Sequence, residues 1–369
     1  MDKTKKSLIS IAVALLLGGL PMVASAVPYV QCPADGVPAG SVADGMIDPA
    51  EKALLDANGQ KCMHVAAGDG YTTMADGKLQ YIFGFADLTD NSTAADAISN
   101  GTFAANFPSP TITLEEGEEF YLTLTNVGMA NRPDLSDPHT VHFHGFPQAS
   151  DIFDGVPDAT ISVNMGASLT YYYNVVEPGT YMYHCHVEAT EHMQMGMLGN
   201  LYVHAAQDNV AVGTLLGAYT HAVGDKYAYN DGDGSTVYQV EAAIQMSSFD
   251  PTFHDASMNT QPLRFAEMKD SYAMLNGRGY PDTVNPVDLP AHAESGGKVS
   301  QKVTALVTAN KGERILLRLS NLNVTNYYTL TALGLDMKVI GKGARQLRGS
   351  DGKDLSYMTN SVTLGGGEA

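Results

Sequence analysis

Two histidine-rich strings decide how this chain is interpreted: Asp-Pro-His-Thr-Val-His-Phe-His-Gly at 137–145, and Tyr-His-Cys-His at 183–186. His192 and Met197 follow the end of the second string by six and eleven residues, and six of the eleven histidines lie in the segment from His139 to His192. Imidazole and thiolate groups are the usual protein ligands of transition metals. The concentration therefore indicates metal binding rather than scattered surface histidines.

The spacing of the first string separates its histidines by face. In a strand, successive side chains alternate between the two faces of the sheet. His142 and His144 would then share one face, whereas His139, three residues before His142, would lie on the other face if the backbone stays extended that far.

The second string repeats this arrangement. His184 and His186 would share a face, and Cys185 between them would point away. Each string thus supplies two imidazoles to one side and one ligand to the other. The pattern predicts two metal centres that are joined through the backbone at Cys185.

The ligand types favour copper at the thiolate centre. Two histidines, a thiolate and a weak axial thioether are typical of blue copper, which exchanges single electrons. His139, Cys185 and His192 would be the strong ligands, and the run Met-Gln-Met-Gly-Met at 193–197 contains the axial candidates. Zinc could also use one cysteine and two histidines, but it would leave the four-histidine face unexplained.

The two strings resemble those of the multicopper oxidases. The resemblance implies that a type 1 copper takes electrons from a substrate and passes them through His-Cys-His to a cluster that reduces dioxygen to water. It places Met197 ahead of Met193 and Met195, which are better explained by packing, because of the Gly-Met step. The matching positions are His139, Cys185, His192 and Met197 for type 1 copper, His142 for type 2 copper, and His144, His184 and His186 for type 3 copper. The catalytic connection between the sites would be made by Cys185, His184 and His186.

Two departures from the family pattern change what we expect. Six residues separate Cys185 from His192, where the usual oxidase pattern has four, so the rim of the type 1 site should be reshaped. The family cluster uses eight histidines, and this chain offers four. The other histidines should be ordinary surface or core residues: His204, His221, His254 and His292.

We therefore expect the missing half of the cluster to come from a later domain or from the neighbouring subunit of a homo-oligomer. The segment 364–369 resembles a turn after which a family domain sends further strands back into its sheet. This favours a fragment or a truncated gene product.

The fold class expected is all-β. Runs rich in Tyr, Phe, Val, Ile and Thr, separated by Gly, Pro, Asn and Asp, are typical of β-sandwiches. The resemblance implies two consecutive cupredoxin-like Greek-key β-sandwich domains, and the second could be incomplete. The expected strands are 78–86, 111–114, 119–125, 141–146, 168–175, 180–186, 199–204, 215–218, 237–246, 303–307, 314–319, 327–332 and 337–340.

Four segments are expected along the chain. They are a signal peptide at 1–26, an irregular N-terminal extension at 27–70 with one helix between 48 and 59, a copper-binding domain at 71–205, and a second domain without copper ligands at 206–369.

The N-terminal segment indicates export. Lys3, Lys5 and Lys6 precede an apolar run, and Ala-Ser-Ala at 24–26 offers a cleavage site, although a retained membrane anchor would look similar. No later apolar run is long enough to cross a bilayer. We expect a periplasmic, cell-surface or secreted protein.

The two remaining cysteines fit this compartment. Cys32 and Cys62 could form a disulfide in an oxidising environment, or they could bind a further metal with His64.

The formal charge of −19 argues against nucleic acid and anionic membranes as partners. Carboxylates near the strings could supply protons or fix histidine tautomers, or could simply sit in turns. They are Asp137, Asp154, Glu188 and Glu191.

Three functions remain open. The first is a multicopper oxidase acting on dioxygen and on a small reductant or a metal ion. The second is a copper nitrite reductase, which would use His139, His144 and His184 but has no need for His142 and His186. The third is a blue-copper electron carrier, which would leave the four cluster histidines idle.

Overall fold

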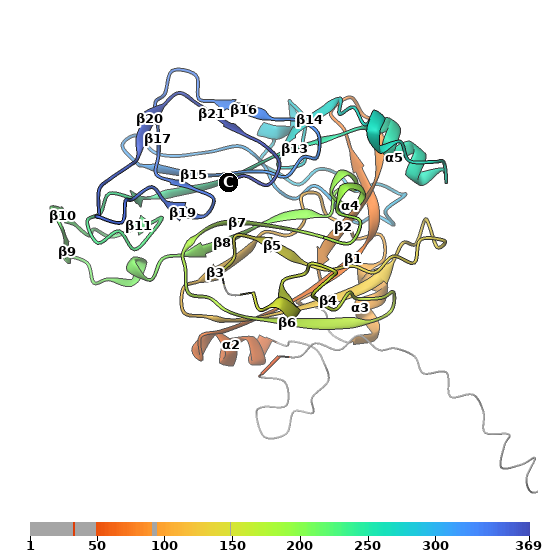
Figure 1. The fold of residues 1–369 in the computed structure, drawn as a ribbon, viewed down its shortest axis with the longest axis horizontal. Coiled ribbons are helices and arrows are strands. Elements are labelled where there is room, and N and C mark those ends of the chain that lie inside the picture. Colours follow the sequence, from red (N-terminus) through yellow and green to blue (C-terminus); the bar gives the residue numbers. More distant parts are fainter. Residues whose placement is uncertain (1–31, 34–48, 91–93, 148) are drawn as a thin grey trace, which may run out of the picture.

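The computed structural model describes residues 32–33, 49–90, 94–147 and 149–369, so the expected signal at 1–26 lies outside the described residues. Strands predominate over short helices, which confirms the all-β class (Figure 1). Within the described ranges, the helices are all too short or too polar to span a membrane.

Two four-stranded sheets form the part of the molecule that carries the histidine strings. The first has the order β2-β1-β4-β6, from β1 (Gln60–Thr73), β2 (Leu79–Asp87), β4 (Glu119–Gly128) and β6 (Ser168–Asn174). The second has the order β3-β8-β7-β5, from β3 (Ile112–Glu115), β5 (His142–His144), β7 (Gly179–His184) and β8 (Leu198–His204).

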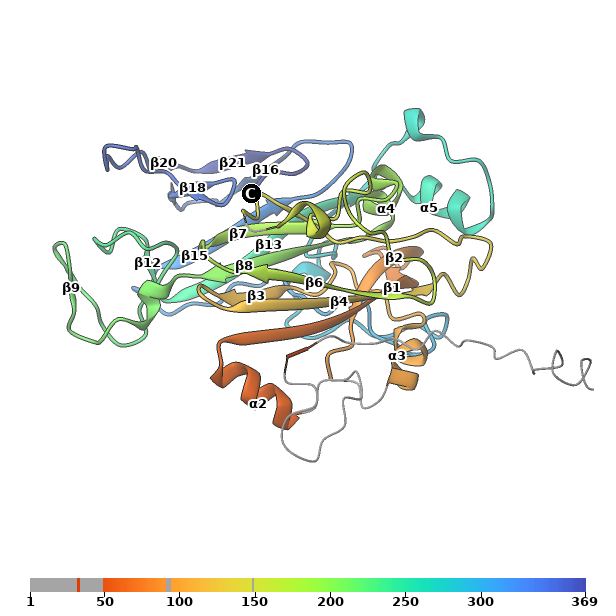
Figure 2. The same cartoon turned by 60° about the horizontal axis from the view of Figure 1, so that its bottom comes forward.

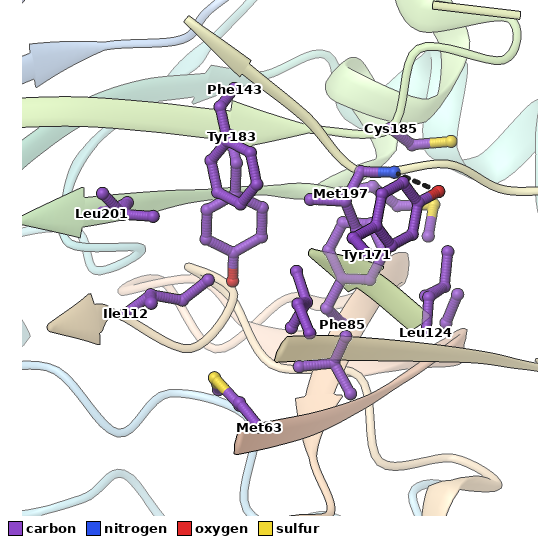
Figure 3. Packing of buried hydrophobic residues seen from close by; sticks show 14 of the residues in the cluster. Met63, Phe85, Ile112, Leu124, Phe143, Tyr171, Tyr183, Cys185, Met197 and Leu201 are labelled. Atoms are coloured by element: carbon purple, nitrogen blue, oxygen red, sulfur yellow. Dashed lines mark hydrogen bonds between the residues drawn. The ribbon is translucent and has the colours of Figure 1, made fainter. Parts of the chain in front are cut away.

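A shared apolar core lies between these sheets. Phe143 of β5 packs edge-on against Tyr173 of β6, with 5.2 Å between ring centroids, and close to Tyr183 of β7. Figure 3 shows Phe143 and Tyr183 next to each other on one side of this core and Leu124 on the other, with Cys185 at its upper edge. The thiol therefore sits where the core meets the loops that leave the sheets.

Strand β1 corrects the expectation that residues 27–70 are irregular. It pairs with β2 on one side and with β4 on the other, so it lies inside the first sheet. Its residues from Cys62 to Thr72 are all buried, and both faces are covered. A strand buried on both faces shows no polar alternation, and Gly68 and Gly70 further hide it. That part of the prediction is wrong.

The short helices are α2 (Pro49–Ala57), α3 (Ala94–Gly101), α4 (Ala189–Met195) and α5 (Pro251–Met258). Helix α2 confirms the expected helix in 48–59, and Gly59 follows it with φ of +68°, a conformation that glycine adopts easily. Helix α4 was not expected; it begins in the loop that follows Cys185 and continues past His192. Single 3₁₀ turns complete the helices: η1 (Asp151–Phe153), η2 (Ala206–Asn209), η3 (Phe265–Glu267) and η4 (Asp282–Val284).

The second half of the chain has smaller sheets. The largest has the order β14-β13-β15, from β13 (Val240–Phe249), β14 (Tyr272–Leu275) and β15 (Ile315–Asn321). Two-stranded ladders join β9 (Leu215–Leu216) to β10 (Tyr219–Thr220), β11 (Lys226–Tyr227) to β12 (Val237–Tyr238), β16 (Tyr328–Thr331) to β21 (Ser361–Leu364), β17 (Met337–Val339) to β20 (Tyr357–Thr359), and β18 (Gly341–Lys342) to β19 (Arg345–Gln346).

The strand expected at 303–307 does not form. Its backbone makes single hydrogen bonds, such as Ala305 N to Thr283 O at 2.8 Å, in place of a ladder. Short apolar runs of this kind do not distinguish a strand from an extended loop.

A polar junction connects the two halves, and Figure 2 shows β13 and β15 running beside β7 and β8. His204, at the end of β8, lies between Glu115 at 2.9 Å and Glu241 at 3.1 Å. Arg318 of β15 donates to Glu241 and stacks over the ring of Tyr202 at 5.0 Å. The Arg318 side chain is 2% exposed, whereas the side chains of Glu241 and Glu115 are 28% and 49% exposed, so the junction is packed around Arg318 and open to solvent at its acidic rim.

Candidate metal centres

Antiparallel pairing of β5 with β7 brings the two strings together. His142 lies opposite His184, and His144 lies opposite Met182. Opposed residues in such a ladder project to the same face. His142, His144 and His184 therefore collect on one side, as their spacing predicted.

The opposite side carries the thiolate centre, formed by His139, Cys185 and His192. One imidazole nitrogen from each histidine and the Cys185 Sγ atom all lie within 4.8 Å of one another. Cys185 Sγ is 3.6 Å from His139 Nδ1 and 3.2 Å from His192 Nδ1. None of the three side chains is more than 1% exposed.

Three different elements hold these ligands. His139 precedes β5 and forms an isolated bridge with Val163. Cys185 is the first residue after β7. His192 lies on α4, which begins after Glu188 in a left-handed conformation with φ of 44°. The longer loop of this chain is thus folded into a helix that turns His192 toward the thiol.

The backbone of Met197, the predicted axial ligand, lies next to Cys185. Cys185 N donates to Met197 O at 3.2 Å, so the two residues are adjacent. Met195 and Met197 belong to the same buried cluster as Cys185, whereas Met193 packs in a separate cluster. The assignment of Met197 as a ligand stays a prediction, and the packing disfavours Met193.

Burial controls protonation at the thiolate centre. Loss of solvent lowers the pKa of His192 to about 4 and that of His139 well below its usual value. It raises the pKa of the Cys185 thiol to about 12. Both imidazoles therefore keep a lone pair at neutral pH, and only a bound cation would stabilise the thiolate.

The second centre contains three imidazoles that converge. One nitrogen from each of His142, His144 and His184 lies within 4.8 Å of the others, and the Nε2 atoms of His144 and His184 are 2.9 Å apart. The ring of His186 is 5.0 Å from that of His142 and 5.6 Å from that of His184. All four histidines thus lie in one patch, with His186 at its margin.

Backbone carbonyls orient these rings. His142 Nδ1 donates to Asp154 O and His184 Nδ1 donates to Cys185 O, both at 2.7 Å. His144 Nδ1 faces Gly367 O at 3.4 Å. A donor bond at Nδ1 fixes the tautomer that presents the Nε2 lone pair, as metal-binding histidines commonly require.

The residues fit copper on two counts. Neutral buried imidazoles next to a buried thiol form the donor set of a blue-copper centre. In the His192 ring, Nε2 has no hydrogen-bond partner among the described residues, whereas Nδ1 contacts the Cys185 sulfur. The three Nε2-directed rings form a second, all-nitrogen site. The two sites are covalently joined, because His184 and Cys185 are consecutive.

The carboxylates near the strings have different surroundings. Asp154 orients His142 through its backbone carbonyl, which lies 2.7 Å from His142 Nδ1, whereas its carboxylate Oδ2 is 3.7 Å away from the same nitrogen. Burial raises the pKa of Asp137, and burial followed by repulsion from Glu188 raises the pKa of Glu191 to about 7. A proton-donor role for any of them stays a prediction.

The four isolated histidines lie outside both centres, as expected. His254 is buried and bonded to two carbonyls, His221 contacts Tyr227, His292 contacts Thr73, and His204 belongs to the junction described above.

Cys32 and Cys62 form a disulfide, which disfavours a further metal site with His64. His64 Nε2 instead contacts Thr125 Oγ1 at 2.7 Å.

Sequence reasoning missed the groups that position the rings. Gly367 O comes from the far end of the described chain, and Thr140 Oγ1 accepts from His186 N at 3.1 Å. Backbone carbonyls leave no trace in residue type, so no signal in the sequence points to them. Of these groups, only the Thr140 side chain could have been noticed in the sequence, because it lies inside the first string.

Comparisons with known proteins agree with this geometry. Residues 90–208 match the family model described as Multicopper oxidase. Multicopper oxidase MmcO of Mycobacterium tuberculosis is 36% identical over 90 residues, which cover 24% of this chain and 16% of that protein. This chain therefore matches only a small part of the relative's length.

Solved structures share the fold over a longer stretch. The blue copper oxidase from Nitrosomonas europaea has a TM-score of 0.55 at 20% identity, and the match covers 84% of this chain and 73% of that one. The multicopper oxidase mgLAC gives a TM-score of 0.55 at 20% identity, covering 84% and 74%. At this identity the likeness establishes the cupredoxin-like fold.

Proposed function

We propose that this chain, of which residues 90–208 match the Multicopper oxidase family model, acts as a multicopper oxidase: it oxidises a reductant one electron at a time and passes the electrons to dioxygen, which is reduced to water. Copper would be its metal. The reductant would be a small molecule or a metal ion.

One observation carries this proposal: a buried thiol with two imidazoles lies back to back with a separate patch of four imidazoles. A simple electron carrier needs only the first group. A nitrite reductase would need His139, His144 and His184, and would leave His142 and His186 without a role. The convergence of all four rings favours the oxidase.

Each residue has a proposed task. His139, Cys185 and His192, with Met197 as the axial group, would hold type 1 copper, which supplies reversible one-electron transfer when bound. His142, His144, His184 and His186 would hold type 2 and type 3 copper. Cys185 donates the sulfur on one side, and the main chain on either side of it leads directly to His184 and His186.

The four-imidazole patch is half of a family cluster, so a partner must complete it. We propose that a later domain or the neighbouring subunit of a homo-oligomer supplies the remaining histidines. The segment 365–369 reaches this patch, with Gly367 O beside His144. The second half of the chain, from about residue 206, would act as a copper-free domain that braces the patch.

We further propose that the protein is exported, to the periplasm, the cell surface or the medium. The Cys32–Cys62 disulfide supports this, because disulfides persist in oxidising compartments.

Copper analysis with dioxygen uptake tests the function. We expect the full chain, assembled with whatever completes its cluster, to bind copper at both centres and to consume dioxygen. His144→Gln should reduce copper content and dioxygen uptake while leaving the blue absorption. The matched control is His221→Gln, which changes a histidine outside both centres. Equal uptake by wild type and His144→Gln, or nitrite reduction in its place, would overturn the proposal.

A further inference from the structure

A buried tyrosine-carboxylate pair lies in the core, and neither of its residues belongs to the groups that form the two metal centres. Tyr81 donates from its hydroxyl to Asp69 Oδ2 at 2.9 Å. Tyr81 is 2% exposed and Asp69 is fully buried. Asp69 Oδ2 also accepts from Asn131 N at 2.8 Å, and Oδ1 has no partner among the described residues.

Strand pairing explains why these side chains meet. Tyr71 of β1 lies opposite Tyr81 of β2, and Asp69 lies opposite Phe83. Paired residues and residues two apart share a face, so all four project into the core together. Tyr81 reaches Asp69 along the diagonal of this ladder.

The same face leads to the thiolate centre. The rings of Tyr71 and Tyr81 are 5.5 Å apart, and those of Tyr81 and Phe83 are 5.6 Å apart. The ring of Phe83 is 5.8 Å from that of His192. Three aromatic residues thus form a continuous path to a proposed copper ligand, with a carboxylate at the second ring.

Most buried tyrosines in this core lack such a base. Tyr173, for example, donates to the carbonyl of Phe153 at the same 2.9 Å, and a carbonyl cannot take up a proton at neutral pH. Asp69 can, and burial raises the pKa of this carboxyl above its usual value, which makes its anion a stronger base.

We propose that Tyr81 is a redox-active tyrosine: it gives one electron through Phe83 to an oxidant held at His192, and its phenolic proton moves to Asp69. The O–H bond of Tyr81 breaks, an O–H bond forms on Asp69, and the phenol becomes a neutral radical. The oxidant is reduced by one electron; its identity as copper(II) rests on the proposed function. An external electron restores the phenol, and Asp69 returns the proton. Tyr81 would serve as a reserve donor when no reductant is bound.

Oxidation of the full chain tests the tyrosine itself. The protein is treated with a soluble one-electron oxidant, hexachloroiridate(IV), frozen after the oxidant is consumed, and examined by electron paramagnetic resonance. Surface tyrosyl radicals couple with one another and disappear, so the radical that persists should be the buried one. We expect a persistent tyrosyl signal in wild type and in the control Tyr173→Phe, and its loss in Tyr81→Phe and in Asp69→Asn. A signal that survives Tyr81→Phe, or one that is indifferent to Asp69→Asn, would overturn the proposal.

A second measurement tests the path to His192. In a chain loaded with copper(II) and held without reductant, the blue absorption should fade as the tyrosyl signal appears, at one shared rate. Phe83→Leu should slow both changes together and leave the yield of radical intact. Equal rates in wild type and Phe83→Leu would refute the path. A chain that binds no copper would instead refute the proposed function and the identity of the oxidant, while the radical signal would still decide the role of Tyr81.

Discussion

His204 should make the stability of the junction depend on pH. The hydrogen bonds that His204 donates to the carboxylate of Glu115, and then to that of Glu241, raise the pKa of His204 from 6.5 to about 9. A group with a raised folded-state pKa stabilises the fold fully below its unfolded pKa, and this contribution is lost as the pH rises through the folded value. The loss should therefore occur between 6.5 and about 9.

The magnitude follows from the same shift. At about 1.4 kcal/mol per unit of pKa, it corresponds to about 3 kcal/mol. The side chain of Glu115 is 49% exposed and that of Glu241 is 28% exposed, so solvent screening should reduce the effect to about 1–2 kcal/mol. The lowered pKa of Glu241 reflects in part the same contact with His204, and it is not counted again.

Urea unfolding of wild type and His204→Gln, at a pH below 6.5 and a pH above 9, measures this contribution. Wild type should lose about 1–2 kcal/mol more than His204→Gln between the two conditions. Other titrating groups are common to both proteins and cancel in the difference. His221→Gln serves as the control, because His221 Nδ1 bonds to a tyrosine hydroxyl and to no carboxylate. Identical pH dependence in wild type and His204→Gln would refute the reasoning.

Three further changes test other parts of the structure. Met197→Leu should shift the blue absorption and the reduction potential of the copper-loaded protein, whereas Met193→Leu, in a separate cluster, should leave both unchanged; equal spectra for the two would remove Met197 from the site. Gly155→Ala should destabilise the protein in urea by more than about 1–2 kcal/mol, because φ is +82° and the new Cβ would lie 2.1 Å from Val141 O. It should also lower the copper content of the histidine patch, because Gly155 follows the Asp154 carbonyl that orients His142. An unchanged free energy of unfolding would contradict this. Cys32→Ala with Cys62→Ala should cost about 2–4 kcal/mol, since the bond closes a loop with a sequence separation of 30, and an unchanged midpoint of unfolding would show that the disulfide does not constrain the unfolded chain.

The two metal centres could be predicted from the sequence because they depend on whether the spacing between ligands along a strand is odd or even. The period of two in a strand separates Cys185 from His184 and His186 wherever the strand lies, so the two groups follow from local geometry. Strand β5 extends only over His142–His144, yet His139 still reaches the other face. The bridge to Val163 holds it there, and this long-range contact was not visible beforehand.

Other features depended on contacts between distant segments. Strand β1 lacks alternation because helices α2 and α3 and the second sheet cover its faces, so its residues resemble those of a glycine-containing loop. Helix α4 begins in a loop whose length departs from the usual pattern. The residue before it, Glu188, has a left-handed backbone conformation, and no glycine at this position indicated such a conformation in the sequence. The tyrosine-carboxylate pair depends on the register of β1 against β2, and the sequence of neither strand predicts that register.

Copper binding to Cys185 tests the central claim most directly. Copper(II) should give the full chain an intense visible absorption and the narrow copper hyperfine splitting of a thiolate-bound site in electron paramagnetic resonance. Cys185→Ser, which keeps the shape of the side chain but removes the sulfur ligand, should lose both signals while the four-imidazole patch still binds copper. A Cys185→Ser protein that remained blue would contradict the account.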